Sequence, residues 1–257
     1  MDKKEILDKI IQKKQFSMIP YEDIVRAFDQ FDKDKYSDEE KVKFTRDLLR
    51  KTFSGFSGEK LLVNKERSSE EVLKKHLSTK ERYASYEEIY ERILKNLPKK
   101  ISVIDLGAGV NGLSYDFFKK VGKEVNYLGV EAVGQLVTLV NNYFEKEKIK
   151  GEMVHFSLFD PGKLDKAIKD MPKPRIIFLF KVIDSLEKGE RDYTKKLLKE
   201  IAPLSDRIVI SFATESWMRR KKFYANRKWL IDFIRENWQF TDDFEIRGER
   251  YIVFQRQ

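Results

Sequence analysis

The stretch Val103-Ile104-Asp105-Leu106-Gly107-Ala108-Gly109-Val110-Asn111-Gly112 decides the fold of this chain. It has the pattern of an apolar strand, a glycine-rich turn and the start of a helix, and its glycines fit Gly-x-Gly-x-x-Gly. Glycine lets a ligand approach the backbone closely, and the free N–H groups of a helix N-terminus attract polar and anionic groups. The pattern alone is weak support for a ligand, because a tight strand–helix turn can have the same sequence.

Strand and helix patterns alternate around this turn. From Pro98 onward, short apolar runs are separated by stretches of helical periodicity. Strands are expected at Ile101–Leu106, Tyr127–Val130, Met153–Phe156, Ile176–Phe180 and Ile208–Phe212. Helices are expected at Leu113–Val121, Gln135–Phe144, Lys163–Asp170, Asp192–Ile201 and Lys228–Trp238. The alternation predicts an α/β fold with a parallel sheet covered by helices on both faces.

The two ends of the chain depart from that alternation. Phe244–Phe254 has the pattern of two strands around Gly248, which predicts an antiparallel hairpin. A mostly parallel seven-stranded sheet closed by such a hairpin is typical of the Rossmann-like class I methyltransferase fold. Residues 1–97 show only helical spacing, so we predict a helical region there and a methyltransferase domain at 98–257. Capping boxes predict helix starts at Ser37, Ser68, Ser78 and Ser85.

Two acidic residues help to choose between nucleotide cofactors. Asp105 stands two residues before the first glycine, where nicotinamide enzymes usually have an apolar residue and S-adenosylmethionine (SAM) enzymes commonly have an acid. Glu131 ends the next strand, where a carboxylate can accept hydrogen bonds from both ribose hydroxyls of either cofactor. Asp105 and the terminal hairpin therefore favour SAM, and a nicotinamide oxidoreductase is the disfavoured alternative.

The composition excludes several classes of site and favours an acidic partner. The 257 residues include no cysteine and two histidines, which excludes a disulfide scaffold, a thiolate nucleophile and a cysteine-ligated metal, and we expect no metal site. The net charge of +9 favours nucleic acid as a partner. No apolar run approaches the roughly 20 residues of a membrane helix, and the charged start lacks the apolar stretch of a signal peptide. We expect a cytoplasmic protein without a membrane partner.

A basic and aromatic segment follows the last predicted parallel strand. It combines groups that contact phosphates with rings that can stack on bases, at the strand edge where open α/β sheets bind ligands. A solvated charged face is the alternative reading of such a segment. The predicted RNA contacts are Trp217, Arg219, Arg220, Lys221, Lys222, Arg227 and Lys228.

Four ordered segments, within roughly residues 70–257, resemble one known family. They are His76-Leu77-Ser78-Thr79-Lys80-Glu81-Arg82, Asp105–Leu113, Phe180-Lys181 with Leu186-Glu187, and Ser211–Ser216. In order and spacing they are similar to the His-x-Ser-Thr-Arg-Glu-Arg, Asp-Leu-x-x-Gly-x-Asn-Pro-Leu, Phe-Lys…Leu-Glu and Ser-Phe-Pro-Thr-x-Ser segments of the aminoglycoside-resistance 16S ribosomal RNA (guanine-N7) methyltransferases. The chain thus resembles that family or a non-resistance relative of it.

The resemblance implies a SAM site and an RNA substrate in the small ribosomal subunit. Its expected residues are Arg82 at the SAM carboxylate, Asp105, Gly107 and Gly109 at the methionine, Glu131 at the ribose, Ser157 and Leu158 at the adenine, and Lys181 near the reaction centre. The family's N-terminal helices dock on ribosomal RNA, which assigns that role to residues 1–97. Without the resemblance, Arg82 could simply belong to a helix start, and Lys181 could bury its stem and solvate its head.

The departures from the family concern mainly the target base. Gly112 and Ala213 replace prolines, and Glu215 stands where an arginine is usual. Trp217-Met218-Arg219-Arg220 replaces a Leu-Gly-Gly-Arg run that faces the base in the family. The identity of the target nucleotide therefore does not carry over.

The expected reaction is methyl transfer from SAM to a ring nitrogen of an RNA base. Guanine N7 has a lone pair and no proton, so alignment of the reacting atoms suffices and no general base is needed. Unstacking of the target nucleotide would give Trp217 a stacking role and Lys181 a bond to the base. The alternatives are a tRNA or small-molecule methyltransferase on the same fold, and a non-catalytic RNA-binding protein.

Overall fold

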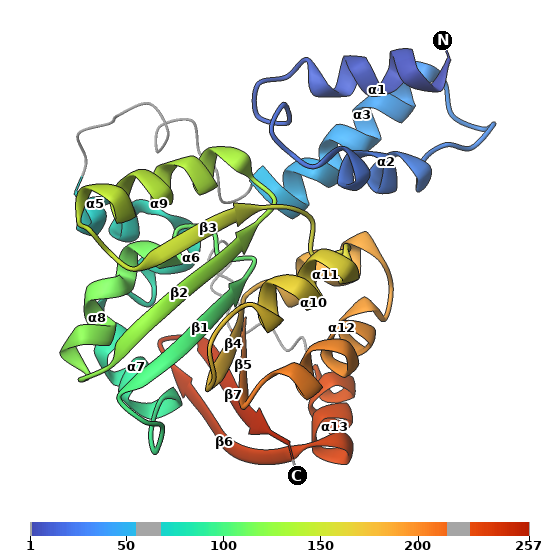
Figure 1. Cartoon of the computed structure of the whole chain (residues 1–257). Coiled ribbons are helices and arrows are strands. Elements are labelled where there is room, and N and C mark those ends of the chain that lie inside the picture. The colour runs from blue at the N-terminus through green and yellow to red at the C-terminus, as the bar shows by residue number, and fades with distance from the viewer. Residues whose placement is uncertain (1, 55–67, 215–226, 257) are drawn as a thin grey trace.

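The computed structural model describes residues 2–54, 68–214 and 227–256, and a seven-stranded sheet forms its centre (Figure 1). The strand order is β3-β2-β1-β4-β5-β7-β6. The strands are β1 (Lys100–Leu106), β2 (Glu124–Glu131), β3 (Gly151–His155), β4 (Arg175–Phe180), β5 (Arg207–Ala213), β6 (Gln239–Ile246) and β7 (Glu249–Gln255). Strands β1 to β5 pair in parallel, and β7 pairs antiparallel with β5 and β6. The predicted class I methyltransferase fold with its closing hairpin is confirmed.

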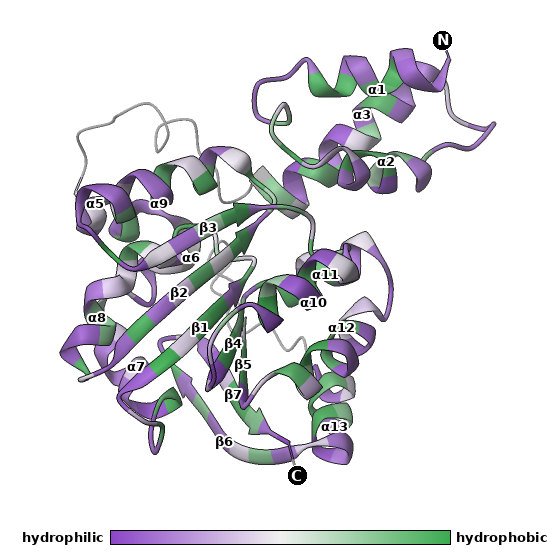
Figure 2. Ribbon diagram, in the orientation of Figure 1, coloured by the Kyte–Doolittle hydropathy of each residue, from purple (hydrophilic) through white to green (hydrophobic). Residues whose placement is uncertain are grey.

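Helices cover both faces of the sheet because alternate residues of each central strand point to opposite sides. Val103 and Phe178 belong to one hydrophobic cluster, with residues of α5 (Ser69–Lys75), α7 (Tyr86–Ile93), α8 (Tyr115–Lys120) and α9 (Gly134–Lys146). Ile104 and Ile177 belong to the other, with residues of α10 (Pro161–Lys169), α11 (Ile183–Gly189), α12 (Tyr193–Ile201) and α13 (Lys228–Asn237). Figure 2 shows hydrophobic stretches along these strands.

The N-terminal helices α1 (Lys3–Ile11), α2 (Tyr21–Asp29) and α3 (Asp38–Leu49) pack around a hydrophobic cluster of their own, and the π-helix η1 (Arg50–Ser54) follows them. In Figure 1 they form a lobe near the C-terminal ends of β1 and β2. Polar contacts tie this lobe to the sheet domain: the Gly134 N–H donates to Met18 O at 3.0 Å, and Arg26 pairs with Glu190 at 3.0 Å. Because α5 and α7 share the core of the sheet, hydrophobic packing groups them with the sheet rather than with α1 to α3.

Two predicted capping boxes are wrong, and two helix starts agree with prediction. Ser37 forms a full capping box, and the Ser68 side chain accepts from the Glu71 N–H. Ser78, however, lies inside α6 (Leu77–Lys80). Ser85 precedes α7 but ends the 3-10 turn η2 (Tyr83–Ser85), and its hydroxyl accepts from Arg247 Nε at 3.0 Å instead of capping the helix.

The short elements were less apparent in the sequence than the long ones. Helix α11 was not predicted, and the helix expected at Leu113–Val121 is divided into a 3-10 turn, η3 (Asn111–Ser114), and α8. A further 3-10 turn, η4 (Ala202–Leu204), follows α12. Within the described ranges, no helix combines the length and apolar character that spanning a membrane requires.

Candidate functional site

The turn after β1 exposes its backbone to a pocket, because two of its residues are glycines. Gly107 and Gly109 have φ of +73° and +54°, a region that disfavours side chains. The Gly107 N–H donates to Val130 O at 2.9 Å, which fixes the turn against β2. A Cβ on Gly107 would lie 2.6 Å from Cγ2 of Val182, so any side chain there would clash. Both glycines line the pocket, as expected for residues that let a ligand approach the backbone.

The third glycine of the pattern has a packing role. A Cβ on Gly112 would lie 2.8 Å from Phe144 Cζ and 2.8 Å from Val140 Cγ1, two side chains of α9. Gly112 therefore lets the turn pack closely against that helix, and it does not line the pocket.

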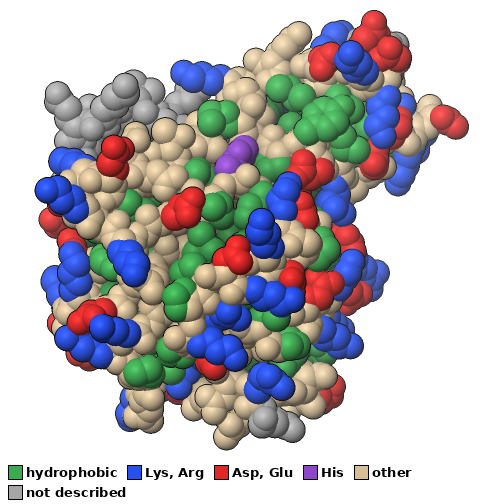
Figure 3. All heavy atoms as spheres, viewed as in Figure 1, with side chains coloured by type: hydrophobic (Ala, Val, Ile, Leu, Met, Phe, Trp, Pro, Cys, Tyr) green, Lys and Arg blue, Asp and Glu red, His purple; other side chains and the backbone are tan. Residues whose placement is uncertain are grey.

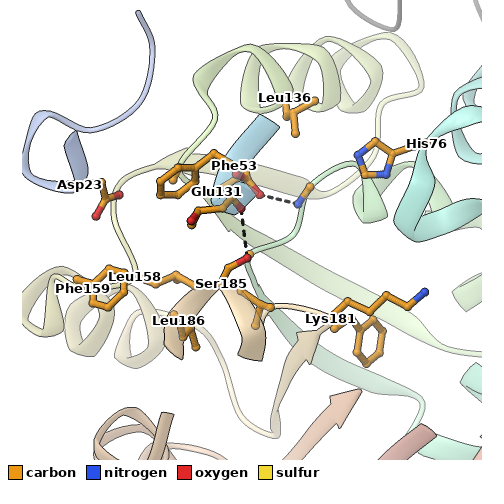
Figure 4. Close-up of a pocket in the computed structure, with 16 residues that line it drawn as sticks. Asp23, Phe53, His76, Glu131, Leu136, Leu158, Phe159, Lys181, Ser185 and Leu186 are labelled. Carbon is orange, nitrogen blue, oxygen red and sulfur yellow. Dashed lines mark hydrogen bonds between the residues drawn. The ribbon is translucent and has the colours of Figure 1, made fainter. Parts of the chain in front are cut away.

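The pocket lies at the C-terminal ends of β1, β2 and β4 and is closed on one side by the N-terminal helices. It holds about 720 Å³ of space, including the part open to solvent. Its walls are mainly apolar. The lining residues are Asp23, Thr52, Phe53, His76, Gly107, Gly109, Glu131, Ala132, Leu136, Leu158, Phe159, Phe180, Lys181, Val182, Ser185 and Leu186 (Figure 4).

Glu131 stands at the end of β2 and faces the glycine turn. Its Oε2 accepts from the Gly109 N–H at 2.8 Å (Figure 4). Its Oε1 accepts from the Val133 N–H at 2.9 Å. Burial raises the pKa of Glu131, and these two backbone N–H groups oppose the rise. The geometry places one fixed carboxylate beside the turn, where the sequence predicted it.

Asp105 is buried behind the turn and does not line the pocket. Its Oδ2 accepts from Asn111 Nδ2 and from the Tyr127 hydroxyl, each at 2.7 Å. Burial raises the pKa of Asp105, and both hydrogen bonds act against that rise. In this structure Asp105 thus positions the turn through Asn111, whereas the expectation placed it at the methionine.

Arg82 is buried in a charged network that connects distant parts of the chain. Its Nε pairs with Glu249 of β7 at 3.0 Å, and its Nη1 donates to Asn111 Oδ1 at 3.2 Å. Its guanidinium also lies 4.9 Å from the ring centre of Phe180. Burial opposes the charge, but Glu249 raises the pKa of Arg82 overall. Arg82 therefore touches the glycine turn through Asn111 and does not itself line the pocket.

Lys181 comes directly after β4 and lines the pocket. Its φ of +56° is unusual for a side-chain-bearing residue, and its N–H donates to Ser211 O at 3.0 Å. Its Nζ pairs with Glu81 and lies 3.2 Å from Oε2 of Glu249. Two carboxylates therefore hold the ammonium at the pocket wall, which argues against a solvated head on a buried stem.

Ser157 and Leu158 follow β3 as predicted, but only Leu158 lines the pocket. The Ser157 hydroxyl donates to Asp23 Oδ1 at 2.5 Å and accepts from the Phe159 N–H at 3.0 Å. Asp23 belongs to α2, so the N-terminal region reaches into the pocket through this contact.

The predicted RNA contacts are only partly described. Trp217, Arg219, Arg220, Lys221 and Lys222 lie outside the described residues. Arg227 differs from the expectation, because it is buried and its Nη2 donates to both oxygens of Asp184 at 2.6 Å. Lys228 is exposed. Asp184, in the first turn of α11, is thus the partner of Arg227.

Sequence reasoning missed several members of this site. Asp23, Glu81 and Glu249 come from elements far apart in the chain, and only tertiary structure brings their carboxylates to the pocket and its charged network. Glu249 offered a weak signal, since it is an acid at the start of an otherwise buried strand. Among the described side chains, no group of three or more His, Cys, Asp and Glu residues is arranged to hold a metal ion.

The sequence of this chain matches a known protein family. The model of the ribosomal RNA methyltransferase (FmrO) family matches residues 55–243. The chain belongs to this family. One curated relative of this chain is the 16S rRNA (guanine(1405)-N(7))-methyltransferase of Proteus mirabilis. The two sequences are 23% identical over 192 residues, which cover 72% of this chain and 64% of that protein.

Solved structures agree with the fold of this chain along its whole length. The 16S rRNA methyltransferase RmtF, solved in complex with S-adenosyl-L-homocysteine, has a TM-score of 0.80 at 20% identity, with 100% of both chains covered. The 16S rRNA methylase RmtB has a TM-score of 0.79 at 16% identity, with 100% of this chain and 99% of that chain covered. The shared fold therefore includes the N-terminal helices.

Proposed function

We propose that this chain transfers a methyl group from SAM to a ring nitrogen of ribosomal RNA, with N7 of a guanine in the small-subunit RNA as the acceptor. One observation carries the proposal: in a chain of the ribosomal RNA methyltransferase family, a bare glycine turn and the Glu131 carboxylate face the same pocket at the strand ends. A particle of the small ribosomal subunit as substrate and a cytoplasmic location belong to the same proposal.

The pocket residues fit SAM in their chemistry. Gly107 and Gly109 line the pocket without side chains, so an extended ligand can lie against their backbone. The Glu131 carboxylate suits the two ribose hydroxyls, and the apolar side chains of Leu136 and Leu158 suit the faces of a purine. When bound, SAM supplies a methyl group on a positively charged sulfur.

The chain's own contribution to the reaction is positioning. Guanine N7 carries a lone pair without a proton, so the residues need only align the base and exclude water. Lys181 is suited to hold the base. An ammonium has three hydrogens, Glu81 and Glu249 accept two of them, and the third can donate to O6 of a guanine at the pocket mouth.

RNA contacts are proposed on two surfaces. The first comprises Trp217, Arg219, Arg220, Lys221, Lys222 and Lys228 of the basic and aromatic segment, without the buried Arg227. The second is a groove between α1 and α3, which we call the N-terminal basic groove and which is lined by Lys9, Lys13, Lys43, Arg46 and Arg50 with Glu39, Val42 and Asp47. Five cations against two acids suit a phosphate backbone.

Transfer of labelled methyl groups from SAM tests the proposal. We expect label in the RNA of small ribosomal subunits, and loss of that label after prior RNase treatment. Label in tRNA or in a small molecule instead would favour the alternative acceptors, and SAM binding without any transfer would favour a non-catalytic RNA-binding protein. Lys181→Met should keep SAM affinity and lower the transfer rate roughly a hundredfold; an unchanged rate would remove Lys181 from the proposal.

A further inference from the structure

Asp23 is a buried carboxylate in the pocket that the reaction described above does not use. It comes from α2 of the N-terminal lobe, its exposed fraction is 4%, and it lines the same pocket as Glu131. Figure 4 shows Asp23 and Phe159 on one side of Glu131, and Lys181 and His76 on the other. Asp23 thus marks the end of the pocket that lies away from Lys181.

The protein satisfies only one oxygen of this carboxylate. The Ser157 hydroxyl accepts from the Phe159 N–H and therefore gives its own hydrogen to Asp23 Oδ1. Among the described residues, no donor bonds to Oδ2 and no cation pairs with Asp23. The nearby Arg26 is used elsewhere, since it pairs with Glu190 at 3.0 Å and lies 4.3 Å from the ring centre of Phe159. Because Asp23 lines the pocket, its Oδ2 is left to accept from water or from a donor on a bound ligand.

We infer that Asp23 accepts a hydrogen bond from the exocyclic amino group of the adenine of SAM, so that the N-terminal lobe completes the cofactor site. The inference rests on the proposed function. With the ribose at Glu131 and the methionine at Gly107 and near Lys181, the base must point toward Leu158 and Asp23. An amino group donating to a carboxylate is a charge-assisted hydrogen bond, among the stronger ones in proteins.

The state of the Asp23 carboxyl is compatible with this role. Burial raises the pKa of Asp23 to about 6, and the bond from Ser157 acts against the rise. At neutral pH the group is therefore mainly ionised and can only accept hydrogen bonds. A purine with a carbonyl oxygen at position 6 would present only an acceptor to this carboxylate, so Asp23 favours a purine with a 6-amino group.

The experiment measures the affinities of S-adenosylhomocysteine and of its analogue in which hydrogen replaces the 6-amino group, both by calorimetry. In the wild-type chain the analogue should bind roughly tenfold to a hundredfold more weakly, because it leaves the carboxylate unpaired. In Asp23→Ala this ratio should fall to about threefold or less, and Asp23→Asn, whose Oδ1 can keep the bond from Ser157 while its Nδ2 donor replaces Oδ2, should lower the ratio at least as far. General loosening of the pocket would weaken both ligands alike, so it would leave the ratio of the two affinities unchanged.

Glu22→Gln is the matched control, because it removes the same charge one residue away from an exposed position outside the pocket. It should leave the ratio at the wild-type value. If Asp23→Ala keeps the wild-type ratio, Asp23 does not contact the amino group and the inference is wrong. If the wild-type chain binds neither ligand, the proposed SAM site itself is wrong, and the two failures are thereby distinguished.

Discussion

At the level of single residues, buried charges at this site are stabilised by ion pairs and hydrogen bonds. Glu249 accepts from Arg82, lies 3.2 Å from the Lys181 ammonium and accepts from the Ser211 hydroxyl. Although burial alone would raise it, the two cations lower the pKa of Glu249. One carboxylate of the C-terminal hairpin therefore connects β4, β5 and the segment before α7. Removing its charge leaves Arg82 buried without a counter-ion.

Glu249→Gln should consequently lower the free energy of unfolding by about 3–5 kcal/mol, the usual cost of breaking a buried ion pair. Urea unfolding measures this. The control is Asp242→Asn, which breaks the pair of Asp242 with Arg92, two side chains that are 30% and 44% exposed. The control should cost less than about 1 kcal/mol. Equal losses in the two variants would show that the buried network contributes no more than a surface pair.

Asp23 gives a prediction about pH. Burial raises its pKa from 3.8 to about 6, with Glu22 and Glu131 adding to the rise and Ser157 and Arg26 opposing it. The folded state thus holds this proton more tightly than the unfolded state, so the stabilisation is complete below about pH 4 and is lost as pH rises through about 6. Asp23→Asn removes the titration. Its free energy of unfolding, relative to wild type, should therefore increase by up to about 3 kcal/mol between those pH values.

Urea unfolding of both proteins near pH 4 and near pH 7 checks this, because other carboxyl groups titrate alike in the two chains. A difference that stays constant across this range would contradict the raised pKa. A variant that gains stability at neutral pH while losing preference for adenine would show that the buried carboxylate is kept for binding rather than for folding.

At the scale of elements, the turn between β1 and η3 carries the most specific requirement. Gly107 and Gly122 share a φ of +73°, but a Cβ on Gly122 meets nothing within 4 Å, whereas one on Gly107 meets Val182 at 2.6 Å. Both alanine variants should lose about 1–2 kcal/mol of stability from the backbone alone. Only Gly107→Ala should also lose SAM affinity, by roughly tenfold or more, as measured by calorimetry. Equal affinities in the two variants would mean that the turn does not contact the cofactor.

Helices α1 and α3 give a prediction for the N-terminal basic groove. Replacing Lys9, Lys13 and Lys43 with Gln should weaken binding of small-subunit RNA and reduce the slope of log affinity against log salt by about 2. Filter binding over a range of salt concentrations measures both. The control replaces three exposed lysines at the opposite end of the sheet, Lys95, Lys99 and Lys100. Similar slopes in both triple variants would remove the groove from the RNA interface.

Prediction from sequence worked best for strands with a clear run of apolar residues and for the tight glycine turn. The strands from β1 to β5 each have a short apolar run, and the turn at Gly107 has glycines where φ is positive, so both were predicted close to their observed bounds. Helix α11 has only seven residues, too few for a hydrophobic period to be recognised in the sequence. The wrong capping box at Ser85 has a tertiary cause, because Arg247 from the hairpin takes its hydroxyl.

At the scale of the whole molecule, the pocket is made by parts that no local pattern connects. Glu131 and the glycines could be placed from sequence because they follow predicted strands. Asp23 could not, since its contact with Ser157 spans 134 positions and depends on how the N-terminal lobe packs. The position of the RNA surface is a second feature that could not be predicted from the sequence. The net +9 predicted an acidic partner, yet Figure 3 shows Lys and Arg interspersed with Asp and Glu on the face viewed, so the composition alone does not locate the RNA surface.

Mapping the methylated nucleotide tests the proposed reaction most directly. Small ribosomal subunits are incubated with the chain and methyl-labelled SAM, and the RNA is digested and analysed by mass spectrometry. We predict label in 7-methylguanine at one position of the small-subunit RNA, and loss of that label with Gly107→Ala while Gly122→Ala retains it. Label on another atom or in another RNA would contradict the proposed acceptor, and absence of label from all RNA, despite SAM binding, would contradict the proposed reaction.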